Sequence, residues 1–288
     1  MKKIEFSKLN GQGNDFIIID ATKKEVSLSK KQITEMCNRN FGIGADGLIL
    51  VKKSKTSDLK MDYYNKDGSV AEMCGNGIRC LARFAWEKKI VGSQKINVET
   101  LAGEKEIFIE CQNGKVRNIK VNMGTPEFRP RKIPVEVKNM NEVFNYKITA
   151  GAKDFYINCV SIGNPHCVIF LESYANLKNF PVCKYGRIIE NISIFPNKTN
   201  VEFVKIKNDN ELNMRVWERG VGETLACGSG ACAAVVCAIK LKKINVEKSG
   251  EVYVNLPGGR LNVYWESLQS DVYLEGEVGY KFDGIYFL

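Results

Sequence analysis

Residues 74–82 read CGNGIRCLA and residues 227–234 read CGSGACAA, so the chain holds two near-copies of a cysteine followed by glycines and a helix start. The glycines allow a ligand to approach the backbone closely. The first turn of the following helix offers unpaired N–H groups and the positive end of the helix dipole, which hold carboxylates and lower the pKa of a nearby thiol. Two matched turns in one chain predict two thiols that face one anionic substrate.

The likeness between the two parts of the chain extends beyond the cysteine turns. Residues 13–19 (GNDFIII) recur as residues 163–169 (GNPHCVI), and residues 47–51 recur as residues 200–204, at a nearly constant offset. Such regular self-similarity indicates two copies of one supersecondary plan. The three prolines at positions 126, 130 and 134 are typical of a linker between the copies.

The sequences of the two copies predict the same order of helices and strands. Short β-rich runs separated by polar turns come first, and the cysteine turn and one long helix follow, at 77–89 and at 230–243. Three more strands follow in each copy, at 95–100, 106–111 and 116–121, and at 251–256, 260–265 and 271–275. We therefore predict an α+β fold of two pseudo-symmetric domains, each a curled, mainly antiparallel, β-barrel-like sheet around a central helix. Because pockets favour domain interfaces, we expect the active site in the cleft between them.

Composition is that of a soluble globular protein, with 288 residues, 44% of them hydrophobic and 26% charged. The net charge of +9 comes from scattered lysines, which favours a solvated basic surface over nucleic-acid binding. The ten cysteines show no C-x-x-C spacing, so we expect reduced thiols in a cytoplasmic protein and no metal site. Neither a signal peptide nor a membrane-spanning run is evident, and no membrane partner is expected.

The candidate catalytic groups each have a simpler structural interpretation. Cysteine is commonly a buried, inert residue, but Cys74 and Cys227 lie outside the apolar helix bodies and next to glycines, which favours function. A polar residue lies nine positions before each cysteine, Asn65 before the first and Glu218 before the second, and this matched spacing favours a shared role. His166 is the single histidine. Whether it is structural or tunes a thiol stays open from the sequence.

The loop at 42–47 (GIGADG) superficially matches a dinucleotide-binding fingerprint. A strand rather than a helix is predicted to follow it, so nucleotide binding is not expected there.

In its ordered motifs the chain resembles the diaminopimelate epimerase family. The motifs are residues 11–16 (GQGNDF), 42–47 (GIGADG), 65–69 (NKDGS), 74–80 (CGNGIRC), 163–166 (GNPH), 200–201 (NV) and 218–230 (ERGVGETLACGSG). The cysteine turns alone would not distinguish it from the proline racemases, which are similar in fold and chemistry. The resemblance implies a cofactor-independent isomerase that converts LL-diaminopimelate to the meso form in lysine and peptidoglycan biosynthesis. It also implies a homodimer.

Site residues carry over from the family onto matching positions. Cys74 and Cys227 would be the acid–base pair, with Glu218 and His166 assisting thiol deprotonation. The residues that would hold the substrate are Asn14, Asn65, Gly75, Asn76, Asn164, Asn200, Glu218, Arg219, Gly228 and Ser229. One departure is Gly47, where some relatives carry a glutamine that reaches the ligand. The resemblance further implies a first half formed by residues 1–124 with a returning C-terminal strand at about 277–288, and a second half formed by residues 125–276.

The two thiols suit inversion at a Cα centre, because removing a proton on one face and returning one on the other requires two groups. Two alternatives stay open. A cysteine hydrolase or acyltransferase would use one thiol with His166, and would leave the duplication unexplained. A redox or metal-binding module is disfavoured by the missing C-x-x-C spacing.

Overall fold

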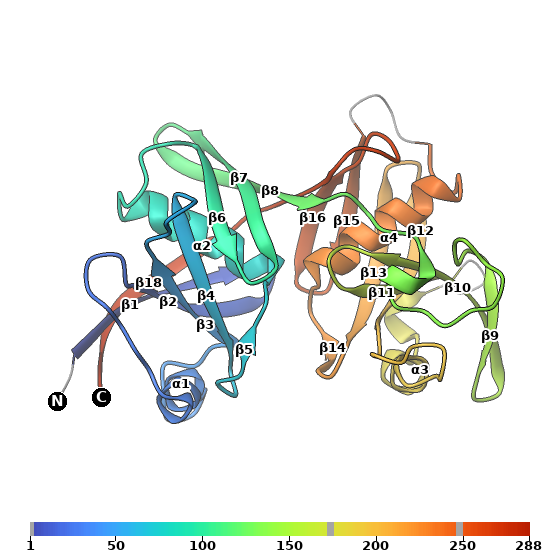
Figure 1. The fold of residues 1–288 in the computed structure, drawn as a ribbon, viewed down its shortest axis with the longest axis horizontal. Helices are drawn as coiled ribbons and strands as arrows, with labels where there is room; N and C mark the ends of the chain where they lie inside the picture. The colour runs from blue at the N-terminus through green and yellow to red at the C-terminus, as the bar shows by residue number, and fades with distance from the viewer. Residues whose placement is uncertain (1–2, 172–175, 246–249) are drawn as a thin grey trace. The chain divides into compact units, whose positions relative to one another are not determined.

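A computed structural model describes residues 3–171, 176–245 and 250–288 of the chain (Figure 1). The chain forms two compact units, Met1–Asn122 with Glu275–Leu288, and Met123–Leu274. Their bounds lie close to those of the halves expected from the sequence, 1–124 with about 277–288, and 125–276.

The first unit is a curled sheet around one helix. Its strands follow in the order β18–β1–β2–β3–β4–β6–β7–β8, in which the β2–β3 and β4–β6 pairs are parallel and the others antiparallel. The last strand, β18, pairs with the first, as the resemblance implies. The elements are β1 (Lys3–Gly11), β2 (Asn14–Asp20), α1 (Lys30–Cys37), β3 (Gly47–Lys52), β4 (Leu59–Asn65), β5 (Val70–Ala71), α2 (Gly75–Glu87), β6 (Lys95–Thr100), β7 (Gly103–Gln112), β8 (Lys115–Gly124) and β18 (Gly279–Phe287).

The second unit repeats this plan. Its β11–β12 and β13–β15 pairs are parallel, and the neighbouring β10–β11, β12–β13 and β15–β16 pairs are antiparallel. The matched order of parallel and antiparallel pairs confirms the predicted duplication. The elements are η1 (Pro130–Lys132), β9 (Tyr146–Ala150), β10 (Lys153–Ser161), β11 (Pro165–Phe170), η2 (Leu177–Asn179), α3 (Val182–Glu190), β12 (Asn200–Asn208), β13 (Glu211–Glu218), β14 (Gly222–Thr224), α4 (Gly228–Lys240), β15 (Glu251–Leu256), β16 (Gly259–Tyr264) and β17 (Val272–Gly276).

The central helix of each unit is buried against its own strands (Figure 1). Helix α2 packs on β1, β2, β3 and β7, and α4 packs on β10–β13, β15 and β16. Helix α4 consists almost entirely of small and apolar residues and is buried nearly all round, as a helix without a polar face must be. The predicted α+β class and curled sheets are confirmed, and over the described residues the sheet is mixed and is not closed into a barrel.

Two details differ from the prediction. The central helices begin at Gly75 and Gly228, two residues earlier than predicted, so that Cys74 and Cys227 become their N-caps. The short helices α1 and α3 were not predicted, although Ser29 and Gln32 form a capping box that signals the start of α1.

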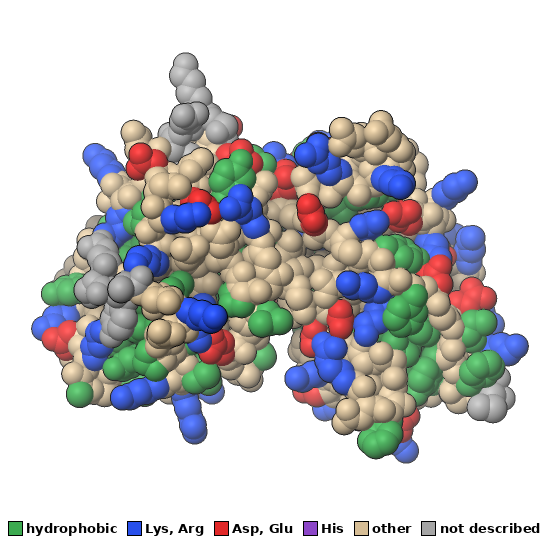
Figure 2. All heavy atoms as spheres, turned by 180° about the vertical axis from the view of Figure 1, so that it is seen from behind, with side chains coloured by type: hydrophobic (Ala, Val, Ile, Leu, Met, Phe, Trp, Pro, Cys, Tyr) green, Lys and Arg blue, Asp and Glu red, His purple; other side chains and the backbone are tan. Residues whose placement is uncertain are grey.

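The basic side chains do not gather on the face shown in Figure 2, where Lys and Arg alternate with Asp and Glu. This agrees with the scattered lysines of the sequence. None of the helices in the described part of the chain is long and apolar enough to span a membrane.

Candidate functional site

Cys74 lies at the N-terminus of α2 with an extended backbone (φ −136°, ψ 120°). Its Sγ accepts a hydrogen bond from the backbone N–H of Gly77 at 3.5 Å, and the residue is half-buried. A helix leaves its first N–H groups without intrahelical partners. Cys74 therefore caps this helix end, where the resemblance implies that the N–H groups of Gly75 and Asn76 hold a carboxylate.

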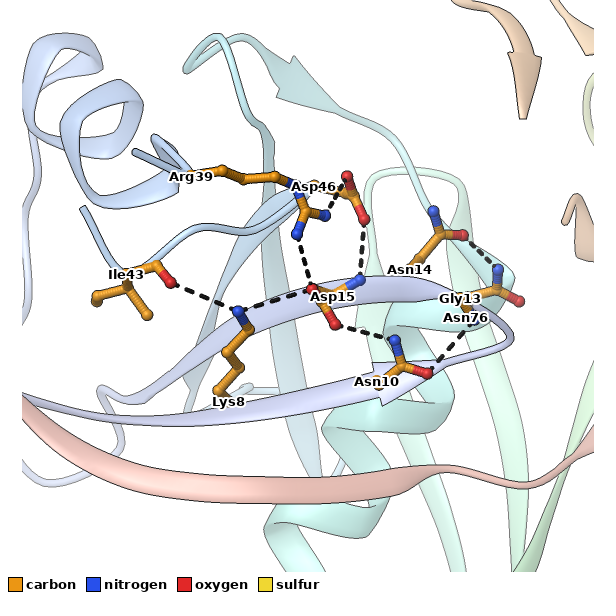
Figure 3. Close-up of polar contacts among 9 residues, drawn as sticks. All are labelled: Lys8, Asn10, Gly13, Asn14, Asp15, Arg39, Ile43, Asp46 and Asn76. Atoms are coloured by element: carbon orange, nitrogen blue, oxygen red, sulfur yellow. Dashed lines mark hydrogen bonds and ion pairs between the residues drawn. The ribbon is translucent and has the colours of Figure 1, made fainter. Parts of the chain in front are cut away.

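Asn14 is joined to this helix end by a chain of side-chain hydrogen bonds. Asn76 Nδ2 donates to Asn14 Oδ1 at 2.7 Å (Figure 3). Asn76 Oδ1 in turn accepts from Arg79 Nη2 at 2.9 Å. Arg79 is fully buried and also donates to the carbonyl of Gly75 at 3.0 Å and to the side chain of Gln12. Asn14 and Asn76 are thus joined at the N-terminus of the helix that Cys74 caps.

An ion-pair network holds the backbone that follows Asn14 (Figure 3). Arg39 bridges the carboxylates of Asp15 and Asp46 at 2.9 and 3.0 Å. The backbone N–H of Asp15 donates to Asp46 Oδ2 at 2.9 Å, and the N–H of Asp46 donates to the carbonyl of Asp15 at 2.8 Å. Burial acts to raise the pKa of Asp15, but hydrogen bonds from Asn10 and Arg39 and the charge of Lys8 hold it below its ordinary value. The start of β2 is therefore fixed to the 42–47 loop.

Asn65 ends β4 directly opposite Gly47 in the β3–β4 ladder. Its Nδ2 donates to Ser69 Oγ at 3.0 Å, and its backbone N–H donates to the carbonyl of Ser69 at 2.9 Å. A Cβ at Gly47 would lie 2.5 Å from Tyr63 Cε2 and 2.8 Å from the carbonyl oxygen of Tyr64. The glutamine of some relatives therefore does not fit at this position, because the Tyr63 ring fills the space.

Cys227 has the same N-cap position on α4 but a different environment. Its Sγ lies 3.6 Å from Ser229 Oγ, and the residue is buried. Burial and the carboxylates of Glu218 and Glu202 raise the pKa of the Cys227 thiol well above its ordinary value, against the lowering effect of Ser229 and the Gly230 backbone. The expectation that the helix start would lower this pKa was wrong, because desolvation and two nearby carboxylates outweigh the dipole.

Glu218 contacts the Cys227 thiol from the end of β13. The pKa of Glu218 is raised above its ordinary value, mainly by burial. Hydrogen bonds with Thr224 and Cys227 act to lower this pKa, while the charge of Glu202 acts to raise it and that of His166 to lower it. Thr224 Oγ1 donates to the carboxylate. Glu218 and Cys227 are therefore adjacent protonatable groups.

His166 is fully buried on β11 and has two side-chain partners. Its Nδ1 lies 2.7 Å from Glu202 Oε1, and its Nε2 lies 2.9 Å from Asn164 Oδ1. Glu202 stands on β12, two residues beyond the ladder partner of His166, so the two side chains share one face of the sheet. A Cβ on Gly230 would lie only 2.8 Å from Glu202 Oε1, so this glycine leaves room for the carboxylate beside α4.

Asn200 and Arg219 lie together, but they are joined through the backbone. Asn200 Nδ2 donates to the carbonyl of Pro165 at 3.0 Å, and Asn200 Oδ1 accepts from the N–H of Arg219 at 2.9 Å. The Arg219 side chain is exposed, and its Nη1 donates to the carbonyl of Asn197 at 3.4 Å. Asn200 thus shapes the turn that presents the Arg219 guanidinium.

In the first unit Asn14 and Asn76 are hydrogen-bonded to each other at the start of α2, and in the second unit Glu218 contacts Cys227; residues that were not predicted extend both networks. The first unit adds Arg79 and Gln12, and the second adds Glu202 and Thr224. A sequence signal existed for two of them. Glu202 interrupts a buried apolar strand and Arg79 interrupts an apolar helix face, and charged residues are almost never fully buried unless they are paired.

A family model described as diaminopimelate epimerase matches residues 6–129 and 158–281. The chain belongs to this family. It is 42% identical over 283 residues to the diaminopimelate epimerase of Leptospira biflexa, with 98% of each chain covered. It is 44% identical over 277 residues to that of Halothermothrix orenii, with 95% of this chain and 94% of the relative covered. The predicted family is therefore confirmed, and the chain is an isomerase of that family.

Solved structures with low sequence identity share the fold. A phenazine biosynthesis protein of the PhzF family from Bacillus anthracis has a TM-score of 0.71 at 16% identity, with all of both chains covered. A hydroxyproline epimerase from Agrobacterium vitis, crystallised with trans-4-hydroxy-L-proline, has a TM-score of 0.71 at 11% identity, with 98% of this chain and 92% of that chain covered. The fold is thus shared with proteins of low sequence identity.

Proposed function

We propose that this chain converts LL-diaminopimelate to meso-diaminopimelate without a cofactor, in lysine and peptidoglycan biosynthesis. The observation that carries the proposal is the pair of cysteines, Cys74 and Cys227, at the N-caps of matched helices in two matched units. Family membership supplies the substrate, because the relatives are named diaminopimelate epimerases.

In this proposal the two sulfurs act on opposite faces of one Cα. One cysteine, as a thiolate, removes the Cα proton, and the other, as a thiol, returns a proton on the opposite face. The raised pKa of Cys227 supports its role as the protonated partner in the unliganded protein. Glu218, which contacts Cys227, takes up the thiol proton when the reaction runs in the other direction.

Charge that develops on the reacting carboxylate needs donors in place before the proton leaves. We assign this role to the N–H groups of Gly75 and Asn76 on α2 and of Gly228 and Ser229 on α4, in the manner of an oxyanion hole. The remaining substrate contacts are assigned to polar groups near the two cysteines. They are Asn14, Asn65, Asn164, Asn200, Glu218 and Arg219.

A direct experiment is to follow the formation of meso-diaminopimelate from LL-diaminopimelate by chiral chromatography. Cys74→Ala and Cys227→Ala should each abolish inversion, whereas Cys183→Ala, an exposed thiol on α3, should leave it unchanged. Inversion at a near-normal rate by either of the first two variants would exclude the two-base scheme.

We also propose that the protein is a cytoplasmic homodimer. All ten cysteines are free thiols, which supports a reducing compartment. Strand β18 exposes Phe282, Ile285 and Phe287, which are 48%, 54% and 51% accessible. Large apolar side chains exposed along one strand are typical of a surface that a second chain covers.

A further inference from the structure

Two asparagines at matched positions of the duplication, Asn14 and Asn164, turn their amide oxygens toward the protein. Asn164 Oδ1 lies 2.9 Å from His166 Nε2. Asn14 Oδ1 accepts from Asn76 Nδ2 at 2.7 Å, and Asn76 Oδ1 accepts from Arg79. An amide carries its acceptor at one end and its two donors at the other. The NH₂ groups of Asn14 and Asn164, both half-buried residues, therefore point away from these inward contacts.

The partners of His166 define its charge. Glu202 Oε1 and Asn164 Oδ1 are both acceptors, and each lies within hydrogen-bond distance of one ring nitrogen. A neutral imidazole has a single N–H, so with Glu202 ionised the ring satisfies both contacts only as an imidazolium. In the first unit the corresponding series of hydrogen bonds, Arg79 to Asn76 to Asn14, begins at the Arg79 guanidinium, which is permanently charged.

An ionised Glu202 needs a positive charge beside it. Its second oxygen, Oε2, is buried and has no hydrogen-bond partner among the described residues. The other titratable groups around it are the thiols of Cys167, Cys227 and Cys237 and the Glu218 carboxyl, none of them cationic. A buried carboxylate is costly unless it is paired with an opposite charge. His166 is the cation that faces it.

We propose that each unit holds a buried cation that fixes the amide of one asparagine with its NH₂ group outward. Arg79 acts through Asn76 on Asn14, and His166, kept doubly protonated by Glu202, acts on Asn164. Resting on the proposed function, we assign the two outward NH₂ groups as donors to carboxylate oxygens of diaminopimelate. His166 and Glu202 are then positioning residues and not the bases of the reaction.

The charge state of His166 can be read directly, because it is the single histidine of the chain. A protein labelled with ¹⁵N-histidine gives one imidazole spin system, which long-range ¹H–¹⁵N spectra resolve without assignment. We expect both ring nitrogens to be protonated in the unliganded protein near neutral pH. One protonated and one bare nitrogen would overturn the proposal.

Variants test the role of Glu202. Glu202→Gln keeps the shape but removes the charge, so one ring nitrogen should lose its proton and the KM for diaminopimelate should rise about tenfold or more, with a smaller change in kcat. Glu211→Gln is the matched control, since this buried carboxylate on β13 pairs with Lys207 and Arg260 and should change neither. An unchanged imidazole spectrum in Glu202→Gln would contradict the proposal.

The corresponding test in the first unit is Arg79→Lys, compared with Arg83→Lys on the same helix. Arg79→Lys keeps the charge but loses the forked contact to Asn76 and Gln12, so KM should rise while Arg83→Lys leaves it unchanged. Equal KM values in the two variants would overturn the Arg79 assignment. Because the spectrum of the unliganded protein requires no turnover, failure of this inference is distinguishable from failure of the proposed activity.

Discussion

Replacing Gly230 by alanine tests whether the space beside α4 is reserved for the Glu202 carboxylate. A Cβ at this position would lie 2.8 Å from Glu202 Oε1, 3.2 Å from Glu202 Cγ and 3.3 Å from Cys227 Cβ. Glu202 is fully buried and is held at 2.7 Å by His166, so its carboxylate has nowhere to move without weakening that contact.

The magnitude follows from two opposing terms. Forcing a methyl group into a packed site costs about 1–3 kcal/mol, and we take the upper value because both neighbours are buried. Alanine is a better helix former than glycine by about 1 kcal/mol. The free energy of unfolding of Gly230→Ala should therefore fall by about 2 kcal/mol.

Gly77 is the matched control, because it occupies the same position in the first turn of α2. A Cβ there would meet Ile49 Cδ1 at 3.2 Å, and Cys74 Cβ and Met61 Cε at 3.4 Å. Ile49 Cδ1 and Met61 Cε are the mobile ends of apolar side chains, and none of the three atoms belongs to a carboxylate. Gly77→Ala should change the unfolding free energy by no more than about 0.5 kcal/mol, since the helix gain offsets the crowding. Urea unfolding followed by circular dichroism and tryptophan fluorescence measures both variants. Equal stabilities of the two variants would refute the packing argument.

Three further predictions use the remaining features. Arg39→Met should raise the KM for diaminopimelate severalfold and lower the free energy of unfolding by no more than about 1 kcal/mol, because the ion pairs of Arg39 with Asp15 and Asp46 are partly exposed. Lys31→Met should change neither quantity. Steady-state kinetics and thermal unfolding measure the two effects. Because the pKa of Glu218 is raised in the folded protein, the group contributes stability at low pH, and this contribution is lost as the pH rises through that pKa. The Tm of Glu218→Gln relative to the parent should therefore increase from about pH 4 to about pH 7. A constant Tm difference would contradict this. Phe282→Glu should produce a monomer in light scattering, while Val70→Glu, at a more exposed apolar site on β5 (63% accessible against 48% for Phe282), should stay dimeric. A dimer in both cases would exclude the β18 surface.

Most of the fold was predictable because the duplication is visible in the sequence. The repeated Gly-Asn pairs at 13–14 and 163–164 and the two cysteine turns fix the order of the strands and the positions of α2 and α4. Hydrophobic periodicity predicts the remaining strands. Helix bounds were less certain, because glycines after Cys74 and Cys227 obscure where a helix begins. The short helices α1 and α3 depend on local capping and on packing against strands distant in sequence.

The sequence named candidate site residues but not the interactions among them. The motifs gave both cysteines, the asparagines and Glu218 through the family resemblance. The motifs did not reveal the pKa values of these groups, because those depend on which side chains are buried in the fold. The environment of Cys227 depends on Glu202, which is distant in sequence and reaches the thiol only because β11, β12 and α4 pack together. Residue type and spacing contain no information about that desolvation.

The central claim, that two single-proton thiols act on opposite faces of one carbon, is tested most directly by early-turnover labelling of the unaltered enzyme in deuterated water. A thiolate that has removed the substrate proton keeps it on its own face, and the opposing thiol delivers solvent deuterium. We expect the first meso-diaminopimelate formed from LL-diaminopimelate to carry deuterium at the inverted carbon, while recovered substrate stays unlabelled. Product that retains the original proton at that carbon would show that a single base acts and would exclude the two-thiol mechanism.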